Sequence, residues 1–114
     1  MDSLIYKVIS AADWAEFQRT GVFGGALVDL ADGYIHFSGR SQLPETLARH
    51  FKGRSDLRVL AVDVSALGDL RWEPSRGGAL FPHLYEPLQI SAVREVSRVD
   101  VQPDGVGDLP DSLA

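Results

Sequence analysis

The chain has 114 residues, of which 45% are hydrophobic and 24% charged, and this balance favours one folded domain and excludes intrinsic disorder. Its 16 acidic and 11 basic residues give a net charge of -5 without a Lys/Arg-rich stripe, so nucleic acid is not expected as a partner. The absence of cysteine excludes disulfides and predicts a cytoplasmic location, and no apolar run approaches the ~20 residues that a membrane span requires, so no membrane association is expected.

The first elements follow from apolar spacing and capping residues. Residues 4–9 are rich in β-branched and aromatic side chains, which is typical of a strand. Ser10 is placed to cap a helix over residues 11–19, in which Trp14 and Phe17 form the buried stripe.

Glycines then interrupt the pattern. Gly24 and Gly25 break any long element, so residues 26–28 are predicted to be a short strand or an extended loop. Residues 34–38 alternate in polarity and are predicted to form a second strand. A second helix is predicted over residues 42–51, because leucine and phenylalanine recur there every four residues.

The second half is predicted to be mostly extended. Residues 57–64 form the most apolar strand and are placed at the centre of the sheet. Residues 70–73 and 92–99 are predicted strands, and residues 81–88 are extended between prolines. We therefore expect one α+β domain over residues 1–101. Residues 102–114 contain three aspartates and no Lys or Arg and are predicted to fray.

Several common functional motifs are absent. The sequence contains no GxGxxG before a helix, no GxxxxGK[ST] and no GxSxG, which argues against Rossmann, P-loop and hydrolase-elbow sites. The three histidines, His36, His50 and His83, lack the i, i+4 spacing of helical zinc ligands, so no metal site is predicted.

Residues that a plain structural domain would not need gather in two segments, 32–38 and 72–85. The two-residue period of a strand puts His36 and Ser38 on one face, where a ring nitrogen and a hydroxyl can contact a sugar or an amide. Exposed aromatic side chains can stack on a planar ring. The two segments together predict a pocket suited to a nucleotide.

The same segments resemble a known bacterial family, the domain of unknown function 952, over about residues 4–101. The resemblance is carried by Tyr6-Lys7, Trp14, Gly21, residues 29–38, Gln42, Phe51, Leu67, Trp72-Glu73 and residues 78–85. Members of that family look like the ADP-ribosyltransferase fold. The resemblance implies a mixed, mainly antiparallel split sheet with two main helices around an NAD-binding cleft.

The resemblance also implies roles for individual residues. His36-Phe37-Ser38 has the His-x-Ser/Thr form that contacts the adenosine ribose and the nicotinamide amide in such enzymes. A later tyrosine, here Tyr85, stacks on nicotinamide. If this function holds, the guanidinium of Arg76, which is next to Gly77-Gly78, can bind a diphosphate with two hydrogen bonds, as a lysine could not. A strand-borne glutamate binds the ribose 2′-hydroxyl in those enzymes, and Glu73, Glu86 and Glu95 are the candidates. Glu73 is preferred because it lies beside the glycine loop, and Glu86 stands where the family usually has glycine.

The implied function is binding of NAD or a related nucleotide, with ADP-ribosyl transfer or NAD glycohydrolysis as the reaction and an unidentified acceptor. The alternative is a non-catalytic module that binds a small metabolite or a protein. The candidate catalytic residues are His36, Glu73 and His83, and the candidate substrate-binding residues are Tyr34, Ser38, Trp72, Arg76, Gly77, Gly78 and Tyr85.

Overall fold

A computed structural model describes residues 3–113 of the chain, apart from the side chain of Arg76. Its helices are α1 (Ala11–Thr20), α2 (Leu27–Asp32) and α3 (Leu43–His50), and its strands are β1 (Leu4–Ser10), β2 (Val22–Phe23), β3 (Ile35–His36), β4 (Leu57–Asp63), β5 (Leu70–Pro74), β6 (Leu80–Leu84), β7 (Leu88–Gln89) and β8 (Val93–Val99). The expected α+β class with mainly antiparallel pairing is confirmed.

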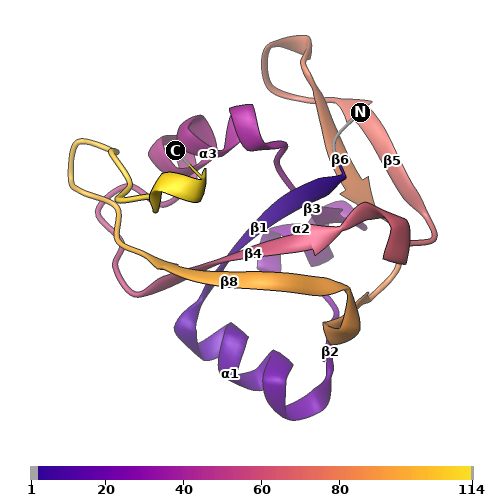
Figure 1. Cartoon of the computed structure of the whole chain (residues 1–114). Coiled ribbons are helices and arrows are strands. Elements are labelled where there is room, and N and C mark those ends of the chain that lie inside the picture. Colours follow the sequence, from indigo (N-terminus) through magenta and orange to yellow (C-terminus); the bar gives the residue numbers. More distant parts are fainter. Residues whose placement is uncertain (1–2, 114) are drawn as a thin grey trace.

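The strands form three groups in the described part of the chain, ordered β1-β4-β8, β2-β7 and β3-β6-β5, and every pairing is antiparallel. The strand predicted to be central, β4, lies between β1 and β8 as expected. In Figure 1 the helices α1 and α3 lie on either side of this sheet, and β5 and β6 project away from it.

The sheet β1-β4-β8 has a hydrophobic core on each face. Successive strand residues point to opposite faces, so Ile5 of β1 packs with Phe17 of α1, and Tyr6 of β1 packs with Leu43 and Leu47 of α3. The helix stripes expected from the sequence therefore supply the two apolar layers.

The ends of α1 follow the predicted capping chemistry. The Ser10 hydroxyl accepts a hydrogen bond from the Asp13 backbone N–H at 3.0 Å. Gly21 closes the helix with a φ of 78°, a left-handed conformation that glycine adopts without steric cost.

Residues 26–28 were expected to be extended, and this prediction is wrong, because Leu27 begins the helix α2. The glycines at 24 and 25 precede the helix rather than break it. The Asp29 carboxylate accepts the Ala26 backbone N–H at 2.8 Å, which satisfies a donor that the helix start leaves free.

The prediction that the chain frays beyond Gln102 does not match the structure. Val101 and Leu113 belong to the core on the α3 face, and Leu113 is only 5% exposed. The Gly53 N–H also donates to the Gln102 carbonyl at 3.1 Å. Apolar burial outweighs the acidic composition of this segment. Across residues 3–113, none of the helices has both the length and the apolar character to span a membrane.

Candidate functional site

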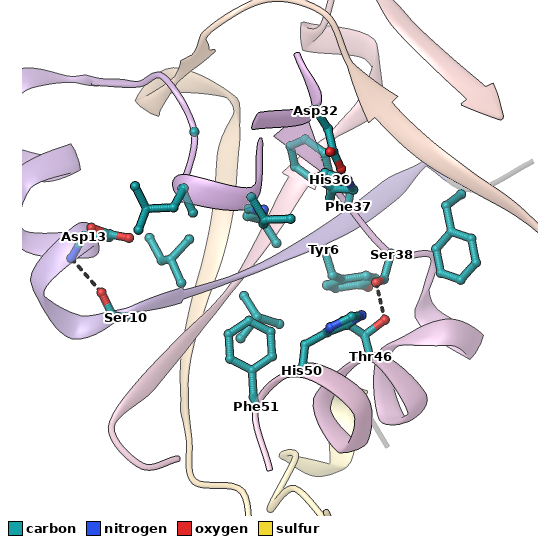
Figure 2. Close-up of a pocket in the computed structure, with 18 of the residues that line it drawn as sticks. Tyr6, Ser10, Asp13, Asp32, His36, Phe37, Ser38, Thr46, His50 and Phe51 are labelled. Atoms are coloured by element: carbon teal, nitrogen blue, oxygen red, sulfur yellow. Dashed lines mark hydrogen bonds and ion pairs between the residues drawn. The ribbon is translucent and has the colours of Figure 1, made fainter. Parts of the chain in front are cut away.

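A pocket of about 810 Å³ lies where the sheet divides. The backbones of Tyr6 and Ser38 exchange hydrogen bonds of 2.8 Å in both directions, which joins β1 to the segment after β3. The residues just before Ser38, which form β3, pair with β6 and not with β1. The pocket fills the space between the diverging strands β1 and β3, called the fork below. It is lined by β1, α2 and α3 (Figure 2).

The pairing of β3 with β6 places His36 directly opposite His83. Their ring centroids are 5.5 Å apart, and both side chains line the pocket. The two sequence segments that carry the candidate residues are therefore brought together.

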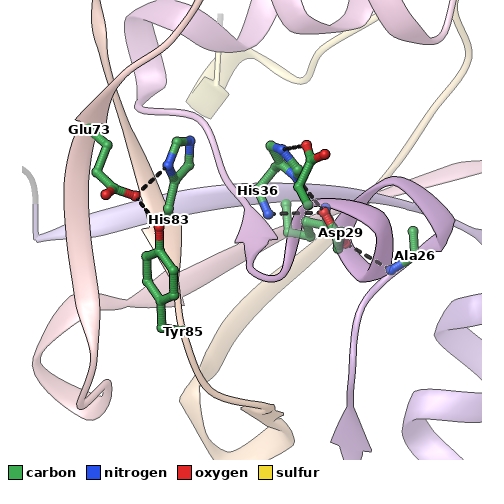
Figure 3. Close-up of polar contacts among 8 residues, drawn as sticks. Ala26, Asp29, His36, Glu73, His83 and Tyr85 are labelled. Atoms are coloured by element: carbon green, nitrogen blue, oxygen red, sulfur yellow. Dashed lines mark hydrogen bonds and ion pairs between the residues drawn. The ribbon is translucent and has the colours of Figure 1, made fainter.

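His36 is held by Asp29, a carboxylate that is 1% exposed. The Asp29 Oδ1 atom accepts from the backbone N–H of His36 at 3.0 Å and contacts its Nδ1 atom at 2.7 Å. The ammonium of Lys7, itself buried, lies 2.9 Å from Oδ2. Figure 3 shows Asp29 reaching His36 and Ala26 from α2. One carboxylate thus fixes a helix end, a strand and a buried lysine.

These contacts set the charge of Asp29. Burial opposes ionisation of this carboxyl, but the hydrogen bonds from His36 and the charge of Lys7 prevail, and the pKa of Asp29 falls to about 2. Burial in turn lowers the pKa of Lys7, against the opposing effect of Asp29. Asp29 is therefore a carboxylate at neutral pH.

His36 has a second carboxylate partner at the pocket, since its Nε2 atom lies 2.8 Å from Oδ2 of Asp32. Of the two ring contacts, the one at Nδ1 has hydrogen-bond geometry, and because Asp29 is a carboxylate, Nδ1 carries the proton of that bond. Asp32 is 45% exposed and can yield this position to a ligand. The Nε2 edge of His36 and the Asp32 carboxylate therefore lie together at the pocket.

His83 is arranged differently. Its side chain is 2% exposed, and its Nδ1 atom lies 2.9 Å from Oε1 of Glu73. The Tyr85 hydroxyl donates to the same oxygen at 2.6 Å (Figure 3). Hydrogen bonds from Tyr85 and His83 lower the pKa of Glu73, and the bond to Glu73 raises the pKa of Tyr85. A proton on Nδ1 leaves Nε2 as an acceptor, and no other described residue bonds that atom.

Tyr34 joins the two histidines. Its ring stacks on His83 with centroids 4.1 Å apart and lies 4.6 Å from the ring of His36. It lies 5.2 Å from the ring of Tyr85, over which Arg71 places its guanidinium carbon at 4.3 Å. The aromatic side chains thus form a wall beside the pocket rather than an exposed stacking platform.

The edge of β1 remains open inside the pocket. Alternate residues of a strand point their backbone N–H and C=O to the same side. Tyr6 uses both groups to bond Ser38, so the N–H and C=O of Val8 also face away from β4. Val8 lines the pocket, and the described residues provide neither backbone group with a partner.

Ser38 shares the pocket but not the histidine cluster. Its hydroxyl is 2.7 Å from the Thr46 hydroxyl of α3. The pocket therefore holds His36 and Ser38 at different places, with the imidazole toward α2 and the hydroxyl toward α3 (Figure 2).

The remaining predicted residues lie outside the pocket lining. Trp72 packs against the core on the α1 face. Gly77 and Gly78 adopt φ values of 63° and 81° in the β5–β6 hairpin, which is the turn role of glycine. The side chain of Arg76 lies outside the described residues.

The other carboxylate candidates are also placed. Glu86 accepts from the backbone N–H groups of Gly68 and Asp69, at 3.3 and 2.7 Å, and so fixes the chain before β5. Glu95 is exposed on β8 and does not line the pocket. Glu73 is the one of the three alternatives that contacts a pocket histidine.

Sequence reasoning missed Asp29 and Lys7 as site residues. Asp29 stands at the third helical position of α2, where a carboxylate can accept the N–H of the residue before the helix. That spacing was available as a signal, but it required α2 to be predicted as a helix. Lys7 lies in an apolar strand, which indicates that a buried partner must exist.

Comparison with known proteins places the chain in a family. Two structures of the protein CC0527 from Caulobacter crescentus are similar to it: a crystal structure with 50% identity and a TM-score of 0.90, covering 96% of this chain and 97% of that chain, and a solution NMR structure with 50% identity and a TM-score of 0.85, covering 99% and 98%. No curated protein matches. Residues 8–96 match the model of the protein family of unknown function DUF952, and the chain therefore belongs to the DUF952 family.

Proposed function

We propose that the protein binds NAD or a related nucleotide in the large pocket and cleaves or transfers at its N-glycosidic bond. The observation that carries this proposal is the pairing of His36 with His83 at the wall of one pocket. Two imidazoles side by side suit a reaction in which one group orients the ligand and the other takes a proton.

The form of the pocket supports the same proposal. Its volume of about 810 Å³ falls within the range of roughly 300–1,000 Å³ typical of ligand pockets. It lies where an antiparallel sheet divides, which is the arrangement that resemblance to the ADP-ribosyltransferase fold implies. The open N–H and C=O of Val8 add a donor and an acceptor for a planar ligand.

The chemistry can be written with the groups present. The ribose–nitrogen bond breaks and its electron pair leaves on nicotinamide, which departs neutral. Water or an acceptor hydroxyl then forms the new carbon–oxygen bond and releases one proton. His83 accepts that proton at Nε2, while Glu73 stabilises the resulting imidazolium. His36 orients the ligand through its Nε2 edge at the pocket.

The alternative is a binding module without catalysis. The observation that favours it is the position of Glu73, whose carboxylate is occupied by His83 and Tyr85 and does not line the large pocket. In this case Glu73, the preferred glutamate, is not free to stabilise the positive charge that develops at the ribose.

The experiment measures nicotinamide release from NAD, together with thermal shifts caused by NAD, ADP-ribose, nicotinamide and AMP. A ligand at 100 times its Kd stabilises the fold by about 2.7 kcal/mol. We expect His36→Gln and Glu73→Gln to abolish release. Glu16→Gln is the matched control, because Glu16 is exposed on α1 and lies outside the pocket.

Three results distinguish the candidates. Release that depends on His36 and Glu73 supports the enzyme. A thermal shift with NAD and no release across a range of acceptors supports the binding module. Neither shift nor release with any of these ligands refutes the nucleotide proposal.

A further inference from the structure

The two sides of the large pocket differ in charge. Among the described lining residues, the carboxylates are Asp13 of α1 and Asp32 of α2. The lining from α3 and the turn after it instead contributes His50 and Arg54. Figure 2 shows Asp32 and His36 on one side of β1 and His50 on the other. Lys7 and His36 also line the α2 side, where both contact the Asp29 carboxylate. On the α3 side, the described chain gives the Arg54 guanidinium no carboxylate partner, so its charge is not neutralised there.

We infer that the α3 side of the pocket binds a diphosphate group through Arg54, with His50 beside it. This inference rests on the proposed function and names the end of the ligand that each side receives. A guanidinium can bind phosphate oxygens with two parallel hydrogen bonds, which suits a diphosphate better than a single donor would.

Arg54 is an exposed residue whose backbone is held by two hydrogen bonds. Its N–H donates to the Phe51 carbonyl at 2.9 Å, and its carbonyl accepts from the Val101 N–H at 2.7 Å. The guanidinium carbon lies 5.3 Å from the centre of the Phe51 ring, which also lines the pocket. Within the described chain, Arg54 forms no ion pair with a carboxylate. Its charge is therefore available to an anion.

Charge complementarity then orients the ligand. The nicotinamide ring of NAD is cationic, and its diphosphate carries two negative charges. In one orientation the cation lies near Asp32 and the diphosphate near Arg54. The reverse orientation brings the diphosphate toward Asp13 and Asp32, where like charges repel, and leaves Arg54 without an anion. The ligand crosses the open edge of β1 at Val8 between these two ends.

Calorimetric titration with NAD, ADP-ribose, inorganic pyrophosphate and nicotinamide riboside tests this assignment. We expect Arg54→Gln to weaken binding of the three phosphorylated probes by about tenfold and to leave nicotinamide riboside unchanged. Lys52→Gln is the matched control, because Lys52 is exposed two residues away and does not line the pocket. It removes the same charge and should leave all four affinities unchanged.

The inference and the proposed function fail in different ways. If both variants weaken the phosphorylated probes equally, or if neither does, the Arg54 subsite is refuted whatever the enzyme does. If wild-type protein binds nicotinamide riboside but not pyrophosphate, the subsite is refuted and the proposed function stands. If pyrophosphate binds in an Arg54-dependent manner and neither NAD nor nicotinamide riboside binds, the subsite stands and the proposed function is refuted.

Discussion

Replacing Asp29 by Asn removes one charge and keeps the side-chain shape. Asp29 contacts the Lys7 ammonium at 2.9 Å and the His36 ring at 2.7 Å, and it accepts from the N–H of Ala26. The substitution leaves an ammonium that is 6% exposed without its counter-charge. Breaking a buried pair in this way costs about 3–5 kcal/mol, and we expect the free energy of unfolding to fall by that amount.

Urea denaturation followed by circular dichroism measures this loss. Asp32→Asn is the control, because it removes a carboxylate of the same histidine at a position that is 45% exposed, where an ion pair is worth about 0–1 kcal/mol. The double variant Lys7→Met/Asp29→Asn should be more stable than Asp29→Asn alone, since no buried ammonium remains. Equal losses for Asp29→Asn and Asp32→Asn would refute the buried-pair explanation.

The same pair predicts a pH dependence. The pKa of Asp29 is lowered from 3.8 to about 2, so its carboxylate stabilises the folded state above pH 3.8 and that contribution is lost as the pH falls toward 2. A shift of this size corresponds to about 2 kcal/mol. The Asp29→Asn variant should therefore lose less unfolding free energy than the wild type as the pH falls from 3.8 to about 2. An equal loss in the two proteins would contradict the assignment.

Replacing Tyr85 by Phe removes the hydrogen bond that most lowers the pKa of Glu73, so an NMR titration should find that pKa raised toward 4.5; an unchanged midpoint would contradict the contact. Ser38→Ala removes the bond to Thr46 and should lower the unfolding free energy by about 1 kcal/mol in thermal denaturation, whereas an unaltered Tm would show that the bond is not formed in solution. Leu113→Ala should cost about 2 kcal/mol in urea denaturation, because Leu113 packs in the core, and no loss would mean that the C-terminal segment is not docked.

Elements with local signals could be predicted from the sequence. Ser10 and Gly21 mark the ends of α1, and Leu43 and Leu47 mark the buried side of α3, because capping and helical periodicity act within a few residues. The apolar run that forms β4 also predicted the central strand, because this signal lies within one short segment. The C-terminal segment was mispredicted because its aspartates suggested a solvated tail. Leu113 instead packs in a core formed by residues of distant elements, among them β1, β4 and α3.

The candidate site could be predicted in part. His36 and His83 could be named as candidate site residues from the sequence, because histidine can exchange protons near neutral pH. Only the pairing of β3 with β6 makes them neighbours, and strand register is not a local property. Asp29 was missed because α2 was not predicted as a helix and because its partner Lys7 lies 22 positions away. The role of that carboxylate arises from tertiary contacts, which a reading of one segment does not contain.

The uncovered rim of β1 at Val8 has a consequence for the protein when nothing is bound. A strand whose outer amide and carbonyl lack partners can accept a strand from another molecule, and exposed leucine and valine on the adjoining helix favour such an encounter. A molecule bound in the fork would also shield this rim. Ligand binding and strand pairing between copies of the chain would therefore compete for the same few backbone atoms.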